Sequence, residues 1–133
     1  MHRDPLGNPV TLDDARSLAA VNDFVEGFIA SEARAANILD AADRDPSPIV
    51  QAYAAAIHLF AESRSAMSNA RPYLERAMAG AHRATPREQG FIAAVAAWAG
   101  ADLDRACALH EAHAREHPRD LASVKLGQYH FFN

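Results

Sequence analysis

The sequence predicts an all-α protein in which antiparallel helix pairs form a tetratricopeptide-like (α-α superhelix) solenoid of about seven helices. Alanine is the most frequent residue, and it has the highest intrinsic helix propensity. Apolar residues recur at helical spacing along most of the chain, and no segment shows the apolar-polar alternation of a half-buried strand. Short turns separate these segments, which places consecutive helices antiparallel.

The first predicted helix pair lies between the N-terminal segment and Pro46. Thr11 is expected to cap a helix that runs to about Ile29. Ser31 is then expected to cap a second helix that ends near Ala42. The polar residues before Pro46 would close this pair.

The second predicted pair begins at Ser47. A serine followed by proline is typical of an N-cap with proline in the first helical position, so a third helix should start at Pro48. A fourth helix should start near Asn69, because Pro72 would then lie in its first turn, where proline is tolerated.

Thr85 begins the strongest local signature in the chain. It is followed by Pro86 and, at the third helical position, by Glu88, which together predict a capping box. The fifth helix should end at Gly100.

The last helices suggest a repeat. Asp102 is expected to cap a sixth helix closed by Pro118, and a seventh should begin near Asp120. A tetratricopeptide unit of about 34 residues has small residues where its helices cross and a proline at its end, and Ala94 and Ala106 fit those positions when Pro118 is that proline. We expect one helical-repeat domain over residues 1–133, made of irregular pairs 11–45 and 47–84, a well-formed repeat 86–118 and the start of a further unit 119–133.

Composition argues against several classes of protein. The formal net charge is −4 and both signs are mixed along the chain, which is untypical of proteins that bind nucleic acid or anionic membranes. The longest apolar run, 91–100, is about half of the ~20 residues that a membrane span requires. A single cysteine, Cys107, and the absence of an apolar signal segment after Met1 favour a cytoplasmic protein.

Several motifs resemble one known family. In chain order they are Asp4-Pro-Leu-Gly7-Asn-Pro9-Val-Thr11, Thr85-Pro-Arg-Glu-Gln89 with Trp98, His117-Pro118-Arg-Asp120 and Phe131-Phe132. Together they resemble the tetratricopeptide repeat protein 38 family. The resemblance implies a helical-repeat fold, a much longer chain of which this is the N-terminal part, and no established catalytic residues. Two departures from the family pattern are Gly90, where a larger residue is usual, and Ala112 with His113, where bulky apolar residues are usual.

A histidine cluster raises the question of a metal site. His113 and His117 match the H-x-x-E-H pattern of inverted zincins, and His110 lies one turn before His113. Only Asp120 and His130 follow as further ligands, so we expect these histidines to be structural. No phosphate-binding, dinucleotide-binding or nucleophile-elbow motif is present, and we predict no metal, no cofactor and no catalytic residue.

A binding surface is the remaining functional prediction. The first helix of each pair lines the concave face of a solenoid, and in the register given by Pro118 that face carries Glu88, Phe91, Val95, Trp98, Lys125 and Tyr129. The competing interpretation is that Phe91 and Trp98 belong to the core. We predict a non-catalytic protein-interaction or scaffolding module with a protein or peptide partner; the alternative is the helical N-terminal portion of a longer enzyme or ligand-binding protein with its active groups further along the chain.

The seventh helix predicts self-association. It carries Phe131 and Phe132 and would have no following helix to cover its apolar side. Because exposed apolar stripes promote association, we expect a homodimer or larger assembly with Phe131 or Phe132 in the contact.

Overall fold

The computed structural model describes residues 1–132, which form seven α-helices, three short 3-10 helices and one two-stranded sheet. The α-helices are α1 (Leu18–Ala30), α2 (Ile38–Ala42), α3 (Pro48–Phe60), α4 (Ala66–Gly80), α5 (Pro86–Ala99), α6 (Leu103–Glu116) and α7 (Leu121–Phe132). The 3-10 helices are η1 (Ala15–Ser17), η2 (Ala33–Asn37) and η3 (Ala81–Arg83). The prediction of an all-α protein with packed helix pairs is confirmed.

The sheet is small and lies at the start of the chain. Strand β1 (His2–Arg3) pairs antiparallel with β2 (Pro9–Val10), and Gly7 takes a positive φ of 85° in the turn between them. Asp4 closes this turn by accepting hydrogen bonds from the backbone N–H groups of Leu6 and Asn8, each at 2.9 Å. The Asp4 carboxylate therefore adds hydrogen bonds that the short pairing of the two strands does not provide.

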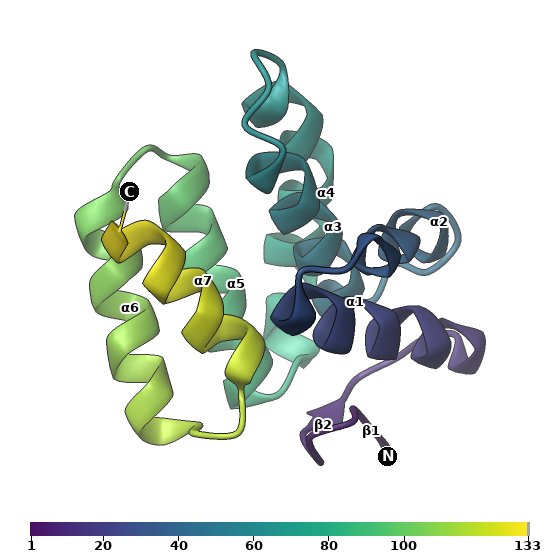
Figure 1. Cartoon of the computed structure of the whole chain (residues 1–133). Helices are drawn as coiled ribbons and strands as arrows, with labels where there is room; N and C mark the ends of the chain where they lie inside the picture. Colours follow the sequence, from purple (N-terminus) through teal and green to yellow (C-terminus); the bar gives the residue numbers. More distant parts are fainter. Residues whose placement is uncertain (133) are drawn as a thin grey trace.

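The helices form two neighbouring pairs with further helices around them. Helix α3 packs on α4, and α5 packs on α6 as well as on both helices of the preceding pair. Helix α7 lies against α6 in front of α5, and it also contacts α1 (Figure 1). Helix α1 packs on η2 and α2, so residues from the beginning and the end of the chain share one side of the molecule (Figure 1).

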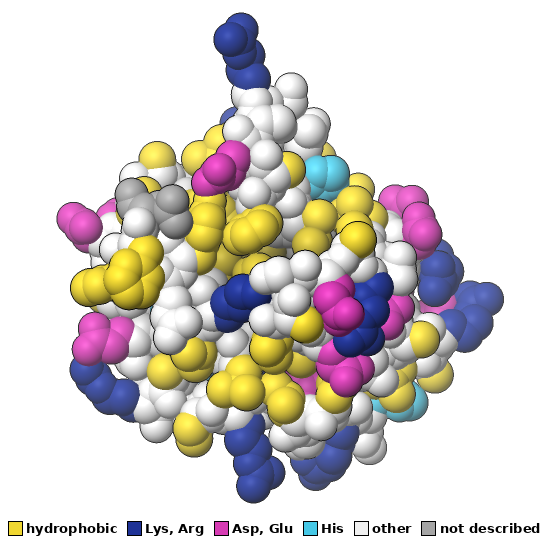
Figure 2. Space-filling view, in the orientation of Figure 1, with side chains coloured by type: hydrophobic (Ala, Val, Ile, Leu, Met, Phe, Trp, Pro, Cys, Tyr) yellow, Lys and Arg dark blue, Asp and Glu magenta, His cyan; other side chains and the backbone are white. Residues whose placement is uncertain are grey.

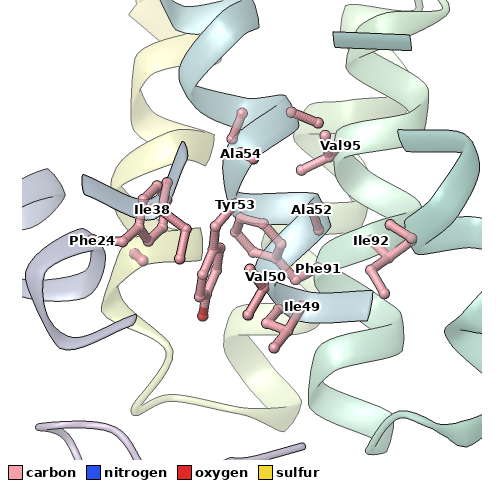
Figure 3. Close-up of a cluster of buried hydrophobic side chains, with 14 of the residues drawn as sticks. Phe24, Ile38, Ile49, Val50, Ala52, Tyr53, Ala54, Phe91, Ile92 and Val95 are labelled. Atoms are coloured by element: carbon pink, nitrogen blue, oxygen red, sulfur yellow. The ribbon is translucent and has the colours of Figure 1, made fainter. Parts of the chain in front are cut away.

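Helix α3 forms the centre of the core. All but three of its residues, Ile57, His58 and Phe60, are buried, which explains its alanine-rich and nearly uncharged sequence. Tyr53 lies between Phe24 of α1 and Phe91 of α5, stacking on the first with centroids 4.1 Å apart and meeting the second edge-on at 5.1 Å (Figure 3). Helices α1, α3 and α5 are thus joined through three aromatic rings.

Two predicted helix starts are confirmed at atomic detail. Thr85 and Glu88 form the capping box at the start of α5, each side chain accepting from the other residue's backbone N–H. Asp102 caps α6 by accepting from the N–H of Arg105 at 3.1 Å. In both cases the cap is local, so neighbouring residues are enough to predict it.

The first two predicted caps are wrong. Thr11 caps no helix, since α1 starts only at Leu18 after η1, and its hydroxyl instead donates to Glu88. Ser31 ends α1 in a left-handed conformation with φ of 59°, and the second helix is reduced to η2 followed by the five-residue α2.

The second predicted pair needs smaller corrections. Helix α3 starts at Pro48 as expected, but the Ser47 hydroxyl donates to Asp45 at 2.5 Å and does not cap the helix. Helix α4 starts at Ala66, so Pro72 lies inside the helix and not in its first turn. The tertiary environment determines these positions.

Candidate partner-binding groove

The predicted binding residues of α5 are core residues in the structure. Glu88, Phe91 and Val95 have no exposed surface, and Trp98 is 8% exposed. Helix α3 covers this side of α5 through Tyr53, which meets Phe91, and α7 covers it through Tyr129 and His130, which meet Trp98. The competing interpretation, that Phe91 and Trp98 belong to the core, describes their position.

Glu88 is buried because its carboxylate is fully engaged. Besides the N–H of Thr85, it accepts from the Thr11 N–H at 3.0 Å and from the Thr11 hydroxyl at 2.8 Å. A carboxylate can be buried when several donors replace its water, and here the N-terminal segment supplies two of them. Glu88 therefore attaches the N-terminal segment to α5.

The two predicted binding residues of α7, Lys125 and Tyr129, are partly exposed. The Lys125 ammonium group donates to the carbonyl oxygens of Phe28 and Ile29 at 2.6 and 2.9 Å and to the Ser31 hydroxyl at 2.6 Å. It thereby neutralises the carbonyl end of α1, where a cation is favoured by the helix dipole. Tyr129 donates its hydroxyl hydrogen to the Glu62 carboxylate, and its ring packs on Trp98.

Lys125 and Tyr129 help to line an open groove, which we call the aromatic groove and define by Phe28, Phe60, Lys125, Tyr129 and Phe132. It consists of two adjoining hollows of about 270 and 430 Å³ that share Phe28, Phe60 and Lys125. Phe60 is 42% exposed and Phe132 is 80% exposed. Figure 2 shows hydrophobic side chains gathered at the centre of this face, where α1 and α7 meet the α3–α4 pair.

The larger hollow extends the aromatic groove over η2. Its floor is made of small and apolar side chains, among them Ala33, Ala36 and Ile57. Glu32 stands at its edge, where Arg34 neutralises it at 3.0 Å. The surface inside the groove is therefore apolar, and its charged groups are at the edge or already paired.

Sequence reasoning missed Phe28 and Phe60. Large aromatic residues on amphipathic helices are usually buried, so the apolar pattern alone predicts a core position for both. Phe28 is 7% exposed and packs edge-on against Phe60 with centroids 5.5 Å apart. The one available signal was the position of Phe60 in the last turn of α3, where a core side chain easily reaches the rim.

A separate hollow of about 400 Å³ lies between α6 and α7. It is lined by Cys107, His110, Glu111, Ala114, Val124, Gly127, Gln128 and Phe131. Phe131 is 76% exposed, so the two last aromatic residues of α7 border different hollows. This provides an internal control for experiments on the aromatic groove.

Opposite the aromatic groove, α5 and α7 begin in a buried ionic cluster, which we call the polar junction and define by Thr11, Arg87, Glu88, His113 and Asp120. One carboxylate oxygen of Asp120 accepts from Arg87 at 3.1 Å and pairs with the Nε2 of His113 at 2.9 Å. Although burial works against the charge, these two partners hold the pKa of Asp120 below its usual value.

Arg87 connects this pair to the N-terminal segment. Its second terminal nitrogen donates to the Pro9 carbonyl at 3.1 Å, and burial opposes its charge, while Tyr53 and Asp120 raise its pKa. Nearby, the Asn8 side chain donates to the Arg119 carbonyl at 3.0 Å. The start of the chain is thus bonded to the residues just before α7.

The three histidines singled out in the sequence have different environments. His113 faces Asp120, and His110 pairs through Nδ1 with the Ser123 hydroxyl at 2.7 Å. His117 is more exposed and stacks loosely on His113, with centroids 4.8 Å apart. Within residues 1–132, no group of three or more histidine, cysteine, aspartate or glutamate side chains is arranged to hold a metal ion.

Comparison of the chain with protein-family models, with curated proteins and with solved structures finds no match. The resemblance to the tetratricopeptide repeat protein 38 family stays a prediction from the motifs alone. In the part of the chain that the structure describes, no helix has both the length and the apolar character needed to cross a membrane.

Proposed function

We propose that this chain is a non-catalytic protein-interaction or scaffolding module of tetratricopeptide-like type, and that its aromatic groove binds an apolar segment of a partner protein. The observation that carries the proposal is the pair of adjoining hollows around Phe28 and Phe60. Exposed phenylalanine side chains beside apolar hollows are typical of surfaces that bind protein partners.

The form of the groove favours a peptide or helix over a cofactor. Each hollow, at about 270 or 430 Å³, is at or below the lower part of the range for small-molecule pockets, roughly 300–1,000 Å³. Both are open, so two neighbouring anchor side chains of one segment could enter them together. This is the helix-in-groove mode of recognition, in which apolar anchors lie one turn apart.

The chemistry inside the groove favours apolar anchors. Lys125 already donates to three oxygen atoms and offers no unpaired charge to an incoming carboxylate. The Tyr129 hydroxyl is bonded to Glu62. Affinity would therefore come from the burial of apolar area, at about 25 cal/mol per Å² before the costs of association.

The helix packing supports the tetratricopeptide-like part of the proposal. A solenoid is built from helix pairs in which the first helix of one pair contacts both helices of the pair before it. Helix α5 has such contacts with α3 and α4. Membership of the tetratricopeptide repeat protein 38 family and a cytoplasmic location are part of the same proposal.

A peptide-display selection tests the groove. A library of random peptides is selected on the chain and counter-selected on the Phe60→Ser and Phe132→Ser variants, and the affinity of enriched peptides is measured by fluorescence polarisation. We expect peptides with two apolar anchors, whose affinity falls about tenfold or more in either variant, because central aromatic residues dominate such interfaces. Phe131→Ser, on the other hollow, should leave the affinity within twofold.

A second readout uses Lys125, which is the only lysine of the sequence. Mass spectrometry after brief acetylation measures the reactivity of the Lys125 amino group. A bound peptide should lower this reactivity below that of the free chain. Equal binding to the wild type and to both groove variants, each with an unchanged urea midpoint, would contradict the proposal. Light scattering of the same samples measures the association through Phe131 or Phe132 that the sequence predicts.

A further inference from the structure

Two histidine side chains meet in the interface between α6 and α7. His110 is 2% exposed and His130 is 5% exposed, and their ring centroids are 5.7 Å apart. The Nε2 atom of each ring is buried and has no hydrogen-bond partner among the described residues. Buried polar atoms are nearly always paired, so two unpaired nitrogen atoms in one interface require an explanation.

Both rings are almost fully buried and the helices meet closely at Gly127, although His110 also lines the hollow between α6 and α7. A Cβ atom at Gly127 would lie 2.8 Å from the Cβ of His110, so the glycine allows α7 to approach α6 closely. On the α5 side, Phe91 faces His110 and Trp98 packs edge-on against His130, with centroids 4.6 Å apart. An imidazolium ion in this setting would have little contact with water.

The charged and titratable groups near the pair come from three helices, and on α6 they include Cys107 and Glu111, which line the same hollow as His110. Asp120, before α7, favours protonation of His110, but it is already shared by Arg87 of α5 and His113 of α6. His113 and His130 each disfavour a second positive charge at His110. On α7, His110 meets the Ser123 hydroxyl, and beside His130 lies Tyr129.

We propose that His110 and His130 form a proton-operated latch, which holds α7 on α6 while both rings are neutral and releases α7 when a ring is protonated. Release would also open the aromatic groove, because α7 supplies Lys125, Tyr129 and Phe132. The latch itself does not depend on partner binding, so it can be tested independently of the proposed function.

The direction of the effect follows from the pKa values. Burial first, and then His130 and His113, lower the pKa of His110 to about 4 from an ordinary value of 6.5. Burial also lowers the pKa of His130. The closed form therefore binds fewer protons than the open form, so closure is fully favourable above pH 6.5 and weakens as the pH falls toward 4.

The expected size can be stated for His110 alone. At pH 5 the open form should gain about 30-fold relative to the closed form when compared with pH 7.5, and His130 adds to this factor. Asp120, whose ordinary pKa is 3.8 and whose folded value is lower, loses its contribution only at more acidic pH. The histidine effect therefore has its own range of pH.

The test combines NMR and fluorescence on the whole chain. Titration of the histidine Cε1 protons gives each pKa directly, and Trp98, the only tryptophan, reports on His130 through its fluorescence. We expect a pKa of about 4 for His110, a lowered pKa for His130, and a urea midpoint that falls from pH 7.5 to pH 5. The double variant His110→Asn/His130→Phe should abolish most of that fall, because an amide can still bond Ser123 and a phenyl ring can pack on Trp98.

His117→Asn is the matched control, since His117 directly follows the last residue of α6 and is partly exposed, and it should keep the wild-type pH dependence. Two outcomes would overturn the latch. One is a pKa at or above about 6 for both His110 and His130 in the wild type, which needs no variant to fold. The other is a double variant that loses stability between pH 7.5 and pH 5 as steeply as the wild type.

Discussion

Helix α7 connects two regions of opposite character. Like α5, it begins at the polar junction, where Arg87 and Asp120 are 4% and 2% exposed and bonded to one another. At the other end, α7 finishes in Phe132, which is 80% exposed beside the aromatic groove. One region holds charges that are buried and paired, and the other holds apolar rings that are open to solvent.

The difference indicates which region is available to a partner. In the polar junction the carboxylates of Glu88 and Asp120 and both terminal nitrogens of Arg87 are bonded within the chain, partly to the N-terminal segment. Of its buried side-chain atoms, only the Arg87 Nε lacks a partner among the described residues. The aromatic groove leaves apolar area that nothing in residues 1–132 covers. Changes in the polar junction should therefore alter stability, and changes in the aromatic groove should alter binding.

The largest expected effect is that of Asp120→Asn. The amide would leave the buried Arg87 charge uncompensated and weaken the bond to His113, so the free energy of unfolding should fall by about 3–5 kcal/mol. Urea denaturation at pH 7 measures it. The exposed Asp104→Asn, in the first turn of α6, is the control and should cost less than about 1 kcal/mol.

Asp120 also predicts part of the acid sensitivity. Because its pKa is lowered in the folded state, it stabilises the fold above about pH 3.8 and loses this effect as the pH falls further. The Asp120→Asn variant should therefore show a shallower loss of stability below that pH. An unchanged acid limb would mean that Arg87 and His113 do not act through this carboxylate.

A smaller loss is expected from Gly90→Ala. A Cβ atom at this position would overlap the His113 ring, with the Cε1 atom only 2.8 Å away, and would displace the ring from Asp120. Overpacking of this kind usually costs about 1–3 kcal/mol. Gly100→Ala is the control, since a Cβ atom there meets nothing closer than 3.5 Å, and thermal unfolding of both variants decides between them.

Lys125→Met tests how much the aromatic groove contributes to the free energy of unfolding. The variant keeps an apolar stem beside Phe28 but loses three hydrogen bonds to the end of α1. We expect a loss of about 1–2 kcal/mol, less than for Asp120 because this site is partly exposed to water. A cost as large as that of Asp120→Asn would break the contrast between the two regions.

The smallest effect is a gain. Ala101 has a φ of 61° in the turn between α5 and α6, a left-handed conformation that glycine adopts without strain. Ala101→Gly should raise the free energy of unfolding by about 0.5–1 kcal/mol, the strain relief being partly offset by the entropy of the unfolded chain. Ala97→Gly, inside α5, should instead lose about 1 kcal/mol by calorimetry.

The parts of the fold that neighbouring residues determine could be predicted from the sequence. The capping box at Thr85 and the cap at Asp102 depend on residues at most three positions apart, and both are where the pattern placed them. Thr11 has the same residue type as Thr85, but its hydroxyl bonds Glu88, 77 positions away. Such a partner leaves no periodic trace in the sequence.

The candidate site was harder to predict, for the same reason. The repeat register placed Trp98 and Tyr129 on one surface, and the two rings are in fact neighbours, 5.9 Å apart. The register did not include α1, which contributes Phe28 to the groove. Which face of a helix is open depends on the last element that packs on it, and long-range contacts decide that.

The bonds that tie the first residues to the last helix also set an order of events during protein synthesis. Asn8 bonds Arg119, which is synthesised 111 residues later, and Phe28 at the end of α1 bonds Lys125, which is synthesised 97 residues later. At translation rates of about 5–20 residues per second, these partners appear roughly 5–20 s after the N-terminal segment. Until then Asn8 and the carbonyl end of α1 lack these partners in the nascent chain, although Arg87 and Glu88 can already bond Pro9 and Thr11, so the contacts of the first residues with the α7 region form late.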